Sequence, residues 1–194
     1  MKWEQVFALL HRFRDKYPGM VLEPLEKDMA GLMTAMSEGA LDAAFIRLPC
    51  ERSKEFSYKV LDIEEMMVAL PKKHPLSQGK EVRLAALRHD TLITFPRDLS
   101  PGLYDAVTQA CKEAGFSPRY GQQCPQITSA LSMVATGFGY ALIPASLSKI
   151  DEANVRCLPL AGQTLTTQIA LAWRRTDNCK AALHLVGLLS VKPQ

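Results

Sequence analysis

Residues 127–144, ITSALSMVATGFGYALIP, show the local order on which the expected fold is based. Residues 127–136 are predicted to form a helix, and residues 140–143 a short apolar strand that Pro144 closes. The glycines between them do not fit a dinucleotide-binding fingerprint, which needs a third glycine and a following helix rather than a strand. We therefore interpret Gly-Phe-Gly at 137–139 as a tight turn that requires positive φ.

The same alternation of helix and strand is expected at the beginning of the chain. Apolar residues at helical spacing predict helices over residues 2–16 and 29–38, and Gly39 is expected to end the second. Strands are expected at residues 20–26 and 41–46. This order predicts an α/β fold with a parallel sheet covered by helices.

The remaining patterns predict more strands and helices, and a division into two lobes. No glycine-rich or serine-rich linker divides the chain, so the lobes are expected to be joined by strands that cross between them near residues 64–70 and 160–167. The predicted lobe I comprises residues 1–64 and 164–194, and the predicted lobe II comprises residues 65–163. Further elements are expected as strands at 65–71, 91–95, 119–123, 155–160 and 166–173 and as helices at 84–87, from about 100 to 115, and at 177–189.

Composition places the chain among ordinary globular domains. It has 194 residues, of which 47% are hydrophobic and 22% charged, and its net charge is +3. Its apolar runs are too short to span a bilayer, and its first residues lack the features of a secretory signal, so no membrane association and a cytoplasmic location are expected. The basic residues are scattered rather than gathered into a stripe, which does not favour direct DNA binding by this chain.

The five cysteines predict free, partly buried thiols. Their number is odd and no pair has CxxC spacing, so neither a disulfide framework nor a zinc site is expected. They are Cys50, Cys111, Cys124, Cys157 and Cys179.

No catalytic, cofactor or metal-binding motif emerges from the sequence. HExxH, GxSxG and a phosphate loop with GK[ST] are all absent, and no histidine stands beside a cysteine in a known pattern. Asp62, Glu64 and Glu65 form a small acidic cluster, and paired carboxylates can perform acid–base chemistry. We interpret this cluster as the solvated entry to a strand, and we predict no catalytic residue, no cofactor and no metal.

The segment 95–103 is the first candidate for ligand binding. A strand is expected to end at its beginning and a helix to start near its end, with Ser100 as the cap. Ligands of open α/β sheets bind at such carboxyl ends, where free helical N–H groups favour an anion. The alternative is a capped loop without a ligand. The candidate residues of this segment are Phe95, Pro96, Arg97, Pro101, Gly102 and Leu103.

Two further positions fit the same kind of site. Thr128 opens the next helix, where its hydroxyl could either cap the helix or face a ligand. Arg47 follows the strand at 41–46, and an arginine there could bind a carboxylate through two hydrogen bonds or pair with a nearby aspartate.

Four stretches in register resemble the effector-binding domain of LysR-type transcriptional regulators, and the likeness covers essentially the whole chain. They are FRDKYPG at 13–19, EGALDAAFIR at 38–47, VALPKKHPL at 68–76 and VATGFGYALIP at 134–144. The segment FPR at 95–97, followed by PGLYD at 101–105, looks most like the subgroup that responds to aromatic acids.

The resemblance implies two Rossmann-like lobes of the periplasmic-binding-protein type (type 2), with an effector cleft between them. It implies a small organic acid, aromatic or dicarboxylic, as effector, and a homodimer or tetramer as the assembly. The cleft would be lined by residues 101–103, by Arg47, and by the hinge residues Thr166 and Thr167. Met29 would also face it, at a position where the subgroup often has threonine, so one hydroxyl contact to a carboxylate is lost.

Two departures from the family pattern lead to further expectations. The family's helix-turn-helix is not in this sequence, so DNA contact would need a segment outside it. The family's first strand should precede the helix at 2–16, and its absence would leave two neighbouring strands unpaired, which predicts a weakened lobe or completion by association. The alternatives are a transporter's solute-binding protein, which the lack of a signal peptide disfavours, and an enzyme on the same frame, such as a lyase or deaminase.

Overall fold

A computed structural model describes residues 3–50, 55–151, 153–175 and 180–189 of the chain. The chain divides into two compact units, unit 1 with residues 1–63 and 168–194 and unit 2 with residues 64–167. Two strands, β2 (Phe56–Pro71) and β7 (Thr166–Arg174), contribute residues to both units. The predicted lobe boundaries lie within four residues of these divisions.

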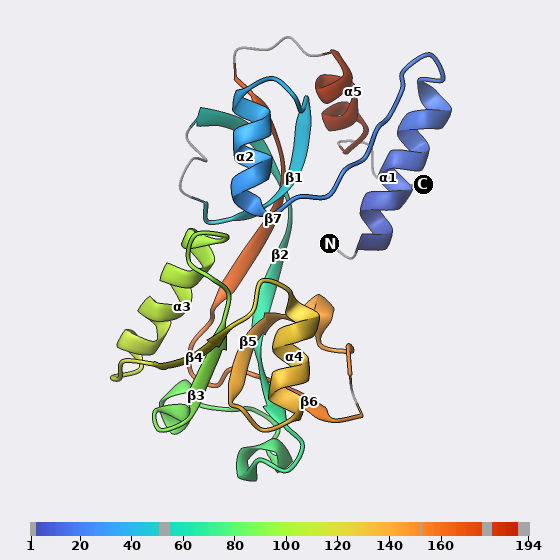
Figure 1. The fold of residues 1–194 in the computed structure, drawn as a ribbon. Coiled ribbons are helices and arrows are strands. Elements are labelled where there is room, and N and C mark those ends of the chain that lie inside the picture. The colour runs from blue at the N-terminus through green and yellow to red at the C-terminus, as the bar shows by residue number, and fades with distance from the viewer. Residues whose placement is uncertain (1–2, 51–54, 152, 176–179, 190–194) are drawn as a thin grey trace. The chain divides into compact units, whose positions relative to one another are not determined.

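Unit 1 buries both faces of a small sheet. Its elements are α1 (Trp3–Lys16), α2 (Met29–Ser37), β1 (Ala43–Leu48), α5 (Lys180–Leu189) and parts of β2 and β7. Because side chains alternate along a strand, Ala44, Ile46 and Leu48 of β1 pack with α2, whereas Phe45 belongs to the cluster formed with α1 and α5. Figure 1 shows α2 beside β1 and α1 near α5.

The prediction of a strand at residues 20–26 is wrong. Residues 21–28 have no regular secondary structure, and Val21 and Leu25 are 85% and 50% exposed. A strand is held by hydrogen bonds to a neighbour, and no described strand pairs with this segment. The alternation of residue types was therefore insufficient to make it a strand.

The expected parallel sheet is only partly correct. In unit 1, β1 pairs antiparallel with β7, from Ala43 opposite Trp173 to Leu48 opposite Gln168. Here the partner of β1 comes from the far end of the chain, and local helix–strand order gives no information about the direction of such a strand.

Unit 2 contains a mixed sheet with parallel pairing at its centre. The second half of β2 pairs antiparallel with β5 (Tyr140–Pro144) and β6 (Val155–Pro159). β3 (Thr91–Thr94) runs parallel to both β5 and β4 (Arg119–Gln123). The sheet order in this unit is therefore β2-β5-β3-β4, with β6 also on β2.

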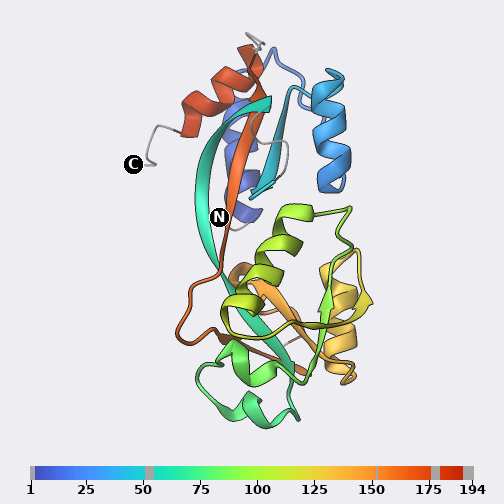
Figure 2. The ribbon, with the colours of Figure 1, turned by 90° about the vertical axis from the view of Figure 1, so that its left-hand side faces the viewer.

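Two helices cover opposite faces of the unit 2 sheet. α3 (Pro101–Glu113) packs with one set of alternating strand residues, and α4 (Ile127–Ala135) packs with the other set. Figure 2 shows β3 between the two helices. Three short 3₁₀ turns, at Pro75–Gln78, Leu84–Leu87 and Ala145–Leu147, complete the described helical structure of this unit.

Arg174 binds backbone carbonyls at and just after the end of α2 in unit 1. Its guanidinium donates hydrogen bonds to the carbonyl oxygens of Met36, at 3.0 Å, and Leu41, and it lies 3.7 Å from the carboxylate of Asp42. This arginine therefore connects the end of β7 to the last turn of α2 and to the segment that precedes β1.

The described cysteines carry free thiols. Cys111 and Cys124 are buried, whereas Cys50 and Cys157 are partly buried. Burial raises the pKa of the Cys111 thiol to about 11, which keeps it protonated at neutral pH. Cys179 lies outside the described residues.

The glycine turn at 137–139 has the predicted backbone conformation. Gly137 and Gly139 have φ of +86° and +154°. At Gly139 a Cβ atom would stand 2.1 Å from the carbonyl oxygen of Thr91, which belongs to the backbone of β3. The start of β5 can therefore approach β3 only because residue 139 has no side chain.

We expect the Gly139→Ala substitution to lower the free energy of unfolding by about 1–3 kcal/mol, because the methyl group collides with a strand backbone that cannot move freely. Urea unfolding followed by circular dichroism measures the change. The matched control is Gly187→Ala in α5, where an added Cβ meets nothing within 4 Å; it should be neutral or stabilising by up to about 1 kcal/mol. Equal stability of the two variants would contradict the close-approach interpretation.

Candidate ligand-binding site

The candidate site lies in unit 2, at the edge where β3 and β4 end. The two strands are parallel, with Thr94 opposite Gln123, and the N–H of Cys124 donates to the carbonyl of Thr94 at 2.9 Å. Because parallel neighbours finish at the same edge, the helices that follow them, α3 and α4, both begin there. This is the location where open α/β sheets bind ligands.

The N-terminus of α3 is not capped by a side chain. Ser100 stands at the predicted cap position with φ −152° and ψ 68°, but its hydroxyl makes no capping hydrogen bond. The first turn contains no acidic residue. The N–H groups of Gly102 and Leu103 lack acceptors within the helix, as first-turn groups do. This end is therefore open to an anion.

The N-terminus of α4 is also uncapped. Gln126 occupies the cap position without a side-chain hydrogen bond, so the capping alternative for Thr128 is wrong. Thr128 is exposed in the first turn, and its carbonyl accepts a hydrogen bond from the Ser132 hydroxyl at 2.9 Å. Two open helix ends thus stand at one edge of the sheet, and both carry the partial positive charge of a helix N-terminus.

The N-terminus of α2, in unit 1, contrasts with these two. The carboxylate of Asp28 accepts the N–H of Gly31 at 2.7 Å and caps the helix. Met29, the first residue of α2, is partly buried against the apolar cluster of unit 1. This helix end already has an anion of its own.

Arg97 is engaged with another side chain. Its guanidinium donates to both carboxylate oxygens of Asp105 in α3, at 3.0 and 2.8 Å. The hydrogen bond from Arg97 lowers the pKa of Asp105, because it stabilises the charged carboxylate. Phe95 and Pro96, directly before Arg97, are partly buried. Contact of these three residues with a ligand stays a prediction.

The other predicted residues are distributed over both units. Arg47 lies on β1 opposite Ile169 of β7, is partly buried and has a polar partner. Thr166 begins β7 and is partly buried, whereas Thr167 is 1% exposed and also has a polar partner. The structure thus places residues 95–103 and Thr128 at the same sheet edge of unit 2; ligand contact by any of the predicted residues stays a prediction.

Comparison with known families decides the class of this domain. Residues 3–190 match the model of the LysR substrate binding domain. The chain belongs to this family. A solved structure of the BenM effector-binding domain, in a variant form, superposes with a TM-score of 0.81 at 27% identity over 94% of this chain and 85% of that one. The predicted α/β class and periplasmic-binding-protein-like (type 2) fold are thereby confirmed.

Similar proteins of the family are named as regulators. The chain is 43% identical, over 95% of its length, to the HTH-type transcriptional regulator BudR of Raoultella terrigena, and 30% identical, over 93%, to the HTH-type transcriptional regulator TtuA of Agrobacterium vitis. It spans 63% and 61% of those two proteins, or about three-fifths of their length. A second BenM structure contains the effector of that domain, benzoate. It is 27% identical to this chain with a TM-score of 0.78, and the match covers 94% of this chain and 82% of the BenM chain.

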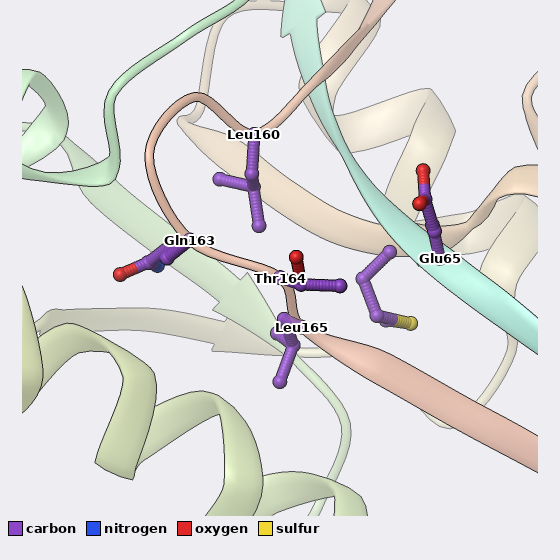
Figure 3. A pocket seen from close by; sticks show the side chains of 6 residues that line it. Glu65, Leu160, Gln163, Thr164 and Leu165 are labelled. Atoms are coloured by element: carbon purple, nitrogen blue, oxygen red, sulfur yellow. The ribbon is translucent and has the colours of Figure 1, made fainter.

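A small cavity in this LysR substrate binding domain is a separate feature. It measures about 40 Å³ and is shown in Figure 3. That volume suits one or two water molecules and is far below the several hundred Å³ of typical ligand sites. The side-chain nitrogen of Gln163 is buried without a partner among the described residues, which fits a bound water. The lining residues are Glu65, Met66, Leu160, Gln163, Thr164 and Leu165.

The described residues contain neither a metal-binding cluster nor a membrane-spanning helix. No group of three or more histidine, cysteine or acidic side chains gathers there in a way that would hold a metal ion. No helix in the same part of the chain combines the length and apolar character needed to cross a membrane.

The difference between capped and uncapped helices can be measured. We expect Asp28→Ala to lower the free energy of unfolding by about 1 kcal/mol, because it removes a capping hydrogen bond. Ser100→Ala should cost no more than a few tenths of a kcal/mol, since the hydroxyl caps nothing. Urea unfolding of both variants gives the comparison. A cost for Ser100→Ala as large as that for Asp28→Ala would show that the α3 end is capped after all.

Proposed function

We propose that this domain is the effector-sensing part of a LysR-type transcriptional regulator and that it binds a small organic acid. The carboxylate would bind at the open N-termini of α3 and α4 in unit 2, near residues 101–103 and Thr128. Binding would bias the conformation of the domain and thereby control transcription. The domain would act as a sensor and not as an enzyme.

The observation that carries this proposal is the pair of uncapped helix ends at one sheet edge. Each end presents N–H groups that lack acceptors within their helix, together with the positive end of a helix dipole. A carboxylate supplies the acceptors and the negative charge that such an end favours. Neither helix has an acidic residue in its first turn that would already fill this role.

The relatives support an acid as the ligand. BenM of Acinetobacter baylyi is 29% identical over 87% of this chain, and benzoate is the effector of the BenM domain. Residues 95–97 and 101–105 resemble the subgroup that responds to aromatic acids. We therefore propose an aromatic acid first and a dicarboxylic acid second.

The role in the full regulator extends the proposal beyond this chain. The similar regulators are named for a helix-turn-helix, and the chain spans about three-fifths of their length. We propose that DNA contact belongs to a segment outside these 194 residues. A cytoplasmic homodimer or tetramer is the assembly that we propose for the whole protein.

We expect benzoate to raise the melting temperature of the domain, because a ligand that binds only the native state stabilises it. At a hundredfold excess over its dissociation constant the rise should be about 5–10 °C for a domain of this size. Differential scanning fluorimetry at constant ionic strength gives the shift. Succinate and acetate test whether a second carboxylate or the carboxylate alone suffices, and neutral benzamide is the control.

A substitution at the helix end makes the test specific. Ser100→Asp places a carboxylate at the N-terminus of α3, where it should compete with the acid and reduce the shift at least twofold. Ser100→Asn has similar size without the charge and should keep more of the shift. If none of the three acids changes the melting temperature at millimolar concentration, or if benzamide acts as strongly as benzoate, the proposed function is wrong.

A further inference from the structure

The ion pair between Arg97 and Asp105 connects a loop to the helix that follows it. Arg97 lies in the loop between β3 and α3, and Asp105 is the fifth residue of α3. Nε and Nη2 of the arginine donate to Oδ1 and Oδ2 of the aspartate, at 3.0 and 2.8 Å. Such a two-pronged contact fixes the orientation of both groups as well as their separation.

This pair is too exposed to contribute much to global stability. The two side chains are 57% and 52% exposed, and exposed ion pairs contribute little to the stability of a protein. Its effect should therefore be local. The ion pair joins the loop to the second turn of α3. The chain segment between its two partners, residues 98–104, contains the first turn of the helix.

The segment between Arg97 and Asp105 contains the helix end that lacks a side-chain cap. The Ser100 hydroxyl makes no capping bond; in the backbone of this turn, the Leu99 N–H donates to the Pro96 carbonyl at 3.2 Å, and the Tyr104 N–H donates to the Ser100 carbonyl at 3.0 Å. A capping side chain normally sets how the chain enters a helix. Here the two-pronged ion pair provides that constraint.

The body of α3 is held against the sheet independently. The ring of Tyr104 stacks on that of Tyr120 in β4, with centroids 5.3 Å apart and planes 13° from parallel. The hydroxyls of Tyr120 and Thr108 lie 2.6 Å apart. Since these contacts fix the helix on its strand, an attachment to Asp105 fixes the loop relative to the same strand.

We infer that Arg97 is a positioning residue for the acid site and acts through Asp105 rather than by contacting the acid. The inference rests on the proposed function. We call the Arg97–Asp105 ion pair the clamp. When this ion pair is formed, the loop holds the N–H groups of Gly102 and Leu103 in the direction that a carboxylate needs. With the clamp open, the uncapped first turn samples more directions and binds the acid less tightly.

The test compares both partners of the clamp. Arg97→Ala and Asp105→Ala should each weaken the binding of benzoate to the 194-residue chain, measured by isothermal titration calorimetry, by about 3–10-fold. The double variant should bind no more weakly than either single variant, because both remove the same contact. The exchanged pair Arg97→Asp with Asp105→Arg should recover part of the affinity. Lys112→Ala, which removes one exposed positive charge from α3 as Arg97→Ala does from the loop, is the control and should stay within twofold.

A direct contact between Arg97 and the acid gives the opposite result. Asp105→Ala would then release the guanidinium and leave the affinity unchanged or increased, while Arg97→Ala would lower it. That outcome overturns the inference. An equal loss in Lys112→Ala overturns it too, because net charge alone would explain the effect.

Hydrogen exchange supplies a measurement that needs no ligand. The amides of residues 98–103 should exchange faster in Arg97→Ala and in Asp105→Ala than in the wild-type chain or in Lys112→Ala. If the wild-type chain binds benzoate but neither exchange nor affinity responds to Asp105, only the clamp is wrong. If the wild-type chain binds none of the acids, the proposed function is wrong. The inference that the clamp affects affinity is then wrong as well.

Discussion

The parallel pairing of β3 with β4 is the constraint on which the candidate site depends. It makes two strands end at one edge of the unit 2 sheet, and the N–H of Cys124 continues the pairing by binding the carbonyl of Thr94. The helices that follow therefore both start at that edge, although α3 and α4 cover opposite faces of the sheet. Burial of both faces holds this arrangement, because neither helix can leave its face without exposing apolar side chains.

Open helix ends on a rigid scaffold are a useful arrangement for sensing. The strands and the buried faces of α3 and α4 fix at which edge of the sheet these helix ends lie, and the proposed acid would bind there. The helix α2 differs, because the carboxylate of Asp28 caps its N-terminus. The missing caps of α3 and α4 leave the corresponding place for an anion from outside.

The two units share strands rather than a flexible linker. β2 and β7 each have residues in both, so the chain passes from one unit to the other within strands. Within unit 1, contacts far apart in sequence secure the sheet. Arg174 at the end of β7 binds the carbonyls of Met36 and Leu41, which precede β1. Such a contact depends on how the chain returns, and no local pattern indicates it.

The sequence by itself determined most of the helices and strands, the glycine turn and the segment 95–103 as a candidate site. These depend on side-chain periodicity, on proline and on glycine, which act over a few residues. Tertiary structure decided the rest. Residues 20–26 have the alternation of a strand but no described strand to pair with, β1 runs antiparallel to β7, and Arg97 binds Asp105 eight residues away. Each of these depends on which distant groups meet, because hydrogen bonds and ion pairs need a partner that local sequence does not specify.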